Sequence, residues 1–179
     1  MSRTGLIRLA ALAAMVGGVA YTGLGLLIPF LEPMYFVLLA LGAMVAIVAL
    51  HALQRERYGL PGKLSSLSVF LGVVLALGSN LGLTEGLPWP IPERIWMVSV
   101  LVAVLGMVAL GIATMAAGVL PWWCGVGLIV GGFGFAGPML VLSWIGFVMG
   151  LLAGVAWAVV GYALLRAGAP QSEQPSRVR

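Results

Sequence analysis

Residues that could carry acid–base, nucleophilic or metal chemistry are few in this chain. It has one histidine, His51, one cysteine, Cys124, no aspartate, and five glutamates, at positions 32, 56, 85, 93 and 173. A lone cysteine excludes an intrachain disulfide and a CxxC redox pair. One histidine without neighbouring carboxylates does not make a metal site or a proton relay. We therefore expect no enzymatic activity, no bound metal and no cofactor.

The positions of these residues point the same way. His51 lies four residues before Arg55, which predicts a place at the lipid headgroups, where histidine anchors a helix end. The candidate nucleophiles Ser79 and Ser143 are predicted on the opposite side from His51, so no serine–histidine pair forms. Cys124 is expected to be a small buried apolar residue.

Five small polar side chains fall near or above the midplane of the predicted helices, towards the outer side. An outward-facing polar vestibule is one hypothesis for them, with Asn80 as its main residue, because an amide in hydrocarbon is costly unless it is satisfied. The other hypothesis is that the hydroxyls bond to backbone in their own or a neighbouring helix. The residues are Thr22, Ser79, Asn80, Ser99 and Ser143.

Glycines recur at a spacing of four in the last apolar run, at Gly146, Gly150 and Gly154. This spacing puts the missing side chains on one helix face and lets another backbone approach closely. We predict that this face packs against a helix of the same chain. A seam between two copies of the chain is the alternative.

The composition places these residues in lipid. The chain is 62% hydrophobic and 8% charged, whereas soluble domains are about 45–50% apolar and about 25% charged. Its net charge of +4 does not indicate a nucleic-acid partner, because the basic residues flank apolar runs instead of forming one face. No run alternates as a membrane β-barrel would. The sequence predicts an all-α, polytopic membrane helix bundle.

About six transmembrane helices account for the apolar runs, since about 20 residues span a bilayer core. As one helix, residues 122–165 would measure about 66 Å, so we predict a break at Gly137-Pro138, because proline disfavours helix continuation. The polar composition of residues 168–179 predicts that they form a disordered cytoplasmic tail. The predicted spans are residues 9–28, 34–53, 64–83, 95–117, 121–136 and 139–165.

The basic residues set the expected orientation. With both termini in the cytoplasm, eight of the nine Lys and Arg residues are inside, as the positive-inside rule requires. Only Arg94 is outside. The first run is longer than the 7–15 residues of a signal-peptide core, which favours a retained helix. Arginine-rich, Ala/Gly-rich usage suggests a bacterium, and we expect a multi-pass protein of its cytoplasmic (inner) membrane.

Two short patterns concern the turns. Met44-Val45-Ala46 before Leu60-Pro61 parallels Met107-Val108-Ala109 before Leu120-Pro121, through either a duplicated hairpin or chance. The stretch 117–127 resembles a helix-turn-helix of uncharacterised bacterial multi-helix integral membrane proteins, in which a Gly-Val-Leu-Pro-x-Trp turn recurs. Trp122 stands here where those proteins carry a basic residue. The resemblance implies a cytoplasmic turn and no particular activity.

These observations leave two classes of function. The first is a structural or partner-binding membrane subunit, which needs only glycine seams and satisfied backbone. The second is a small transporter or permease-like component, which needs polar groups or broken helices near the midplane. The partners that we expect are the lipid bilayer and either a second copy of the chain or another membrane protein, with no nucleic acid.

Overall fold

The computed structural model describes residues 3–27, 32–82, 91–135 and 144–167. Within them the chain forms six helices and no strand, which confirms the predicted all-α class. The helices are α1 (Arg3–Leu27), α2 (Glu32–Gln54), α3 (Gly59–Asn80), α4 (Ile91–Ala117), α5 (Trp122–Phe135) and α6 (Trp144–Ala167).

Prolines explain where several of these helices begin. Pro33, Pro61 and Pro92 all lie in the first turn of their helices, where a missing N–H costs nothing and a fixed φ suits the helix. The third and fourth spans were predicted from residues 64 and 95. The structure starts α3 at Gly59 and α4 at Ile91, because proline in a first turn opens a helix and does not block it.

The long apolar run 122–165 forms two separate helices. α5 ends at Phe135 and α6 begins at Trp144. The predicted break at Gly137-Pro138 and the predicted tail 168–179 both lie outside the described residues.

Three helices of the described chain are long and apolar enough to cross a membrane, fewer than the six predicted. They are Gly59–Ser79, Glu93–Ala117 and Val148–Ala167. The other three apolar helical stretches, Ile7–Ala20, Ala40–Gln54 and Trp122–Gly134, are shorter, at 10–17 residues. The 14 residues of α5 rise about 21 Å, against a hydrocarbon core of about 30 Å.

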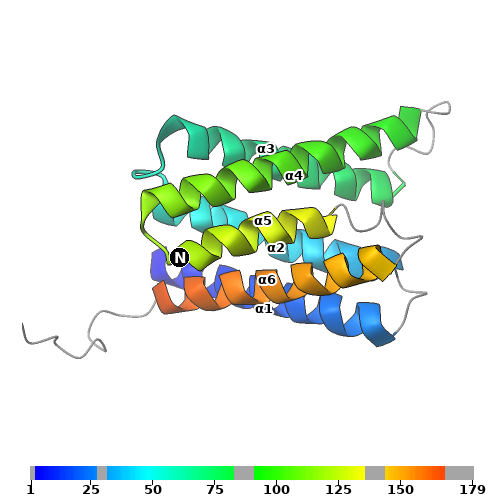
Figure 1. The fold of residues 1–179 in the computed structure, drawn as a ribbon, viewed down its shortest axis with the longest axis horizontal. Coiled ribbons are helices and arrows are strands. Elements are labelled where there is room, and N and C mark those ends of the chain that lie inside the picture. Colours follow the sequence, from blue (N-terminus) through cyan, green and yellow to red (C-terminus); the bar gives the residue numbers. More distant parts are fainter. Residues whose placement is uncertain (1–2, 28–31, 83–90, 136–143, 168–179) are drawn as a thin grey trace, which may run out of the picture.

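Consecutive helices run up and down, and chain neighbours lie side by side (Figure 1). The ring closes because α1 packs along α6 at one edge and α3 along α4 at the other, the two most extensive helix pairs. Contact between α2 and α3 is the least extensive of the pairs around the ring. We call the end at which α1, α3 and α5 begin the N end.

Backbone contacts at glycine hold α1 against α6. A Cβ at Gly18 would lie 2.8 Å from the backbone nitrogen of Ala158, and a Cβ at Gly161 would lie 2.7 Å from the carbonyl oxygen of Ala11. Small residues on facing surfaces allow helix backbones to approach this closely. These glycines therefore permit the close approach of α1 and α6.

The same device recurs at the opposite edge. A Cβ at Gly72 in α3 would lie 2.6 Å from the backbone nitrogen of Ala103 in α4. Between the two edges, the indole of Trp157 is almost fully buried, and a Cβ at Gly131 in α5 would meet its Nε1 at 2.9 Å. One large side chain thus fills the space that glycine leaves.

Left-handed glycines shape both turns that share the Leu-Pro pattern. Gly59, before Leu60-Pro61, has φ +62°, and Gly118, before Leu120-Pro121, has φ +63°. Glycine adopts this conformation without steric cost. The parallel between the two turns therefore extends from their sequences to their backbone geometry.

Candidate functional site

The clearest polar arrangement in the described residues lies at the N end, where α2 turns into α3. The turn is short because the backbone nitrogens of Arg57 and Tyr58 both donate to the carbonyl oxygen of Gln54, at 2.8 and 3.2 Å. Gly59 then reverses the chain with its positive φ. The turn places Tyr58 over the first turns of α3.

Tyr58 occupies a space that exists only because residue 62 is glycine. A Cβ at Gly62 would overlap the Tyr58 ring. Residues four apart share a helix face, so the ring lies over Gly62 and its hydroxyl reaches Ser66, one turn further on. Tyr58 is buried as a result.

The Tyr58 hydroxyl joins α2 to α3. Its oxygen lies 2.5 Å from Nδ1 of His51 and 3.1 Å from Oγ of Ser66. Ser66 Oγ in turn donates to the carbonyl oxygen of Gly62 at 2.9 Å. The rings of His51 and Tyr58 meet edge-on, with an interplanar angle of 87°. We call these four residues the Tyr58 cluster.

The number of available protons decides which atom donates in each hydrogen bond of the Tyr58 cluster. A hydroxyl has a single hydrogen to donate, and that of Ser66 goes to the Gly62 carbonyl. Tyr58 must then donate to Ser66 and accept from His51. The arrangement therefore requires a proton on Nδ1 of His51, a tautomer assigned from the hydrogen-bond network.

Burial keeps the Tyr58 phenol protonated, as this direction requires. Burial raises the pKa of Tyr58 above its usual 10.0. The phenol is therefore neutral at physiological pH and available as a donor. The Tyr58 cluster links two helices whose other contacts are sparse.

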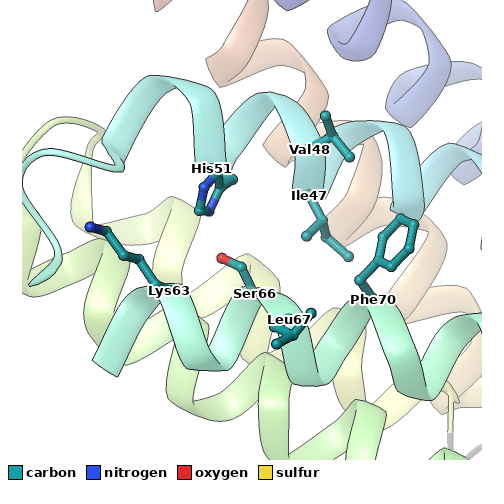
Figure 2. Close-up of a pocket in the computed structure, with 7 residues that line it drawn as sticks. All are labelled: Ile47, Val48, His51, Lys63, Ser66, Leu67 and Phe70. Atoms are coloured by element: carbon teal, nitrogen blue, oxygen red, sulfur yellow. The ribbon is translucent and has the colours of Figure 1, made fainter. Parts of the chain in front are cut away.

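Beside the Tyr58 cluster lies a groove between α2 and α3, with a volume of about 200 Å³ (Figure 2). Its polar side chains, His51, Lys63 and Ser66, come from the end nearest the turn. The remainder of the lining is apolar. It consists of Ile47, Val48, Leu67 and Phe70.

The residues predicted to line a vestibule are not brought together where the structure describes them. Thr22 Oγ1 donates to the carbonyl oxygen of Gly18 in α1, and Ser99 Oγ donates to that of Ile95 in α4. Thr22 faces Gly154 of α6, at the edge opposite the α3–α4 pair of Ser99. Ser79 Oγ is buried and has no hydrogen-bond partner within the described chain.

The other predicted positions divide between described and undescribed parts. The side chain of Asn80 and the whole of Ser143 lie outside the described residues. Gly154 lies against α1, where a Cβ would be 2.7 Å from the carbonyl oxygen of Gly18. Gly150 is half-buried. Gly146 lies on α6, but its burial is not described.

Metal-ligating side chains do not gather at one place in the described residues. No group of three or more His, Cys, Asp or Glu in them could hold a metal ion. Cys124 is buried in the core. Every charged side chain whose exposure is described lies at the surface.

Sequence reasoning identified His51 but missed Tyr58, Gly62 and Ser66. Their spacing of four was the available signal: a tyrosine at a helix start with glycine and serine on the same face. Nothing local indicates that His51, on the preceding helix, completes the set. That depends on the angle at which the turn sets α2 against α3.

Comparisons of this chain with protein-family models, with curated proteins and with solved structures found no match.

Proposed function

We propose that this chain is a six-span protein of a bacterial cytoplasmic membrane, with both termini in the cytoplasm, and that it serves as a structural or partner-binding subunit. Three of its helices are long and apolar enough to cross. In full, α1 and α2 have 25 and 23 residues, about 37 and 35 Å of helix, which supports their spanning as well. α5 would be a short span held between longer neighbours.

The outer surface of the bundle supports lipid as its surroundings. Large apolar side chains point outward from several helices, among them Leu12 in α1, Leu71 in α3, Leu105 in α4 and Val155 in α6. Soluble monomers seldom expose apolar patches beyond a few hundred Å². Trp122, 69% exposed at the start of α5, suits the membrane interface.

Charge supports the proposed orientation. In the described residues the N end carries most of the basic side chains, whereas Glu93 and Arg94 are the exposed charged pair at the opposite end. The positive-inside rule then places the N end in the cytoplasm. The basic residues at the N end are Arg8, Arg55, Arg57, Lys63 and Arg166.

A subunit role is carried by one observation: the helices meet backbone to backbone at glycines, at both edges of the ring. Together with the buried apolar side chains that pack between the helices, such packing leaves little room for a substrate path. The hydroxyls of Thr22 and Ser99, which a transport path would use, bond to their own helices and lie at opposite edges. This supports a subunit over a transporter.

Reporter fusions test the topology. A reporter that is active only in the cytoplasm should be active when fused after Arg179 or within the α2–α3 turn, and inactive when fused between α3 and α4. Activity of a periplasmic reporter after Arg179 would contradict the proposed orientation. A protein that stays monodisperse in buffer without detergent would contradict the membrane placement itself.

Cysteine labelling tests the subunit role. In a Cys124→Ala background, single cysteines at Leu12, Leu71, Leu105 and Val155 sample four outward faces. A lipid-phase maleimide should leave at least one face unlabelled in native membranes and label it after solubilisation has removed the partner. Equal labelling of all faces in both states would favour a solitary protein.

A second copy of the chain is one candidate partner, and Gly150 tests it. Gly154 already contacts α1, so a seam between copies would depend on the half-buried Gly150. Gly150→Leu should abolish a crosslinked dimer if α6 forms that seam. A dimer that persists would assign the protected face to a different helix or to another protein.

A further inference from the structure

The groove between α2 and α3 changes in character along its length. Figure 2 shows Lys63, His51 and Ser66 at one end and Phe70 at the other. Lys63 and Phe70 are seven positions apart on α3, about 10 Å along the helix axis. A ligand lying in this groove would have a polar or charged head at the N end and an apolar part pointing towards the middle of the bundle.

The dimensions of the groove favour a thin, flexible occupant. Pockets for drug-sized molecules measure about 300–1,000 Å³, and this groove measures about 200 Å³. A partner helix with its side chains is about 10–12 Å across, which is too thick to enter between adjacent helices. An extended acyl chain is the common membrane component that would fit.

The charge at the open end favours an anionic head. Within the described chain, Arg55 is paired with Glu56 at 3.9 Å, and neither Arg57 nor Lys63 has a carboxylate partner. Lys63 is exposed where it lines the groove. An ammonium with three donors beside a lipid-facing groove is suited to a phosphate.

We infer that the α2–α3 groove binds one anionic phospholipid, with its phosphate at Lys63 and the upper part of an acyl chain against Ile47, Val48, Leu67 and Phe70. The Tyr58 cluster keeps α2 and α3 at the separation that the acyl chain of the lipid needs. The inference rests on the membrane placement proposed above and is independent of the subunit role.

Native mass spectrometry of the detergent-solubilised protein tests the headgroup. Wild type should retain one molecule of dioleoyl phosphatidylglycerol at a lipid concentration about fivefold lower than it needs to retain one molecule of dioleoyl phosphatidylcholine. Lys63→Gln should remove that preference. Arg166→Gln, which removes an exposed cation at the same end on α6, should keep it. Equal losses in the two variants would overturn the inference in favour of general surface charge.

A groove-filling variant tests the acyl chain. Val48→Trp places an indole in the groove from a position that is 45% exposed, so folding is preserved, and retention of both lipids should fall. Leu75→Trp, at an exposed position of α3 outside the groove, is the matched control. Unchanged retention in Val48→Trp would overturn the inference.

Inorganic phosphate distinguishes a lipid from a free anion. A millimolar excess should not displace phosphatidylglycerol, because the acyl chain supplies part of the binding. Displacement by phosphate would mean a headgroup site alone and would overturn the acyl-chain assignment. Lipid binding without any protected face in the cysteine scan would contradict the subunit role and leave this inference standing.

Discussion

Gly62 and Tyr58 show how one missing side chain can organise a helix junction. The Tyr58 ring lies where a Cβ at residue 62 would be. From there its hydroxyl reaches both His51 and Ser66. Each hydrogen bond of this kind contributes about 0.5–1.5 kcal/mol net, so the Tyr58 cluster matters at a junction where α2 and α3 otherwise touch little.

The effect of Gly62→Ala on the free energy of unfolding should change sign when Tyr58 is also replaced. In wild type the methyl displaces the Tyr58 ring, and we expect the free energy of unfolding to fall by about 1–3 kcal/mol. In a Tyr58→Ala background the same substitution meets no ring. It should then be neutral or stabilising by up to about 1 kcal/mol, because alanine is the better helix former.

Unfolding by SDS titration of the four proteins in this cycle measures both values. An equal loss of stability from Gly62→Ala in the two backgrounds would show that the ring does not occupy the space over Gly62.

His51 should carry its proton on Nδ1. The proton count in the Tyr58 cluster requires that nitrogen to donate to Tyr58. His51 is the only histidine of the chain, so the side-chain nitrogen shifts of a ¹⁵N-histidine-labelled sample report it directly. A neutral ring with its proton on Nε2 would contradict the assigned direction. Tyr58→Phe is the control, since it removes the acceptor and should relax the preference for one tautomer.

At the scale of helices, the contribution of a glycine to packing depends on which atoms of the neighbouring helix face it. Some glycines of the bundle oppose the backbone of a neighbouring helix, which cannot move aside without separating the two helices. Others oppose a side-chain methyl group at a longer distance, which needs to give way by only a few tenths of an ångström. Gly18 is of the first kind. Gly127 is of the second, because a Cβ added there would meet chiefly a methyl group of Val160, at 3.1 Å.

Gly18→Ala should therefore destabilise the protein and Gly127→Ala should not. A Cβ at Gly18 would lie 2.8 Å from the backbone nitrogen of Ala158, and overpacking of this kind costs about 1–3 kcal/mol. For Gly127→Ala we expect a change between zero and a gain of about 1 kcal/mol. Thermal unfolding in one detergent compares the two, and equal effects would contradict the close α1–α6 approach.

At the scale of the whole molecule, the first three helices and the last three form two halves joined at two edges. The α1–α6 and α3–α4 pairs are the most extensive in the structure, and both join one half to the other. Each half alone would leave two of these surfaces without a partner.

The two halves should therefore assemble when they are expressed as separate chains. Residues 1–86 and 87–179, each with its own tag, should copurify from a membrane extract. Introducing Gly18→Leu together with Gly72→Leu, which obstructs both edges, should prevent copurification. Halves that remain separate without these substitutions would contradict the two-edge architecture.

Much of the fold was decided by local properties that the sequence states directly. Long apolar runs favour helices because a chain in lipid must satisfy its own backbone. Prolines such as Pro61 and Pro92 lie at helix starts for reasons that involve one turn of chain. The number of helices and most of their ends follow from such short-range effects. The helices α3 and α4 begin before the predicted spans, because those spans counted apolar residues and so began after Lys63 and Arg94.

What only the tertiary structure decided is which surfaces meet. Glycine spacing indicates that a face can be approached closely, but it does not identify the helix that approaches, so the contact of Gly18 with α6 could not be read from α1. In the same way, His51 and Ser66 lie in different helices, and their common partner Tyr58 depends on the angle of one turn. Periodicity is a property of a single helix, whereas pairing depends on the shapes of two.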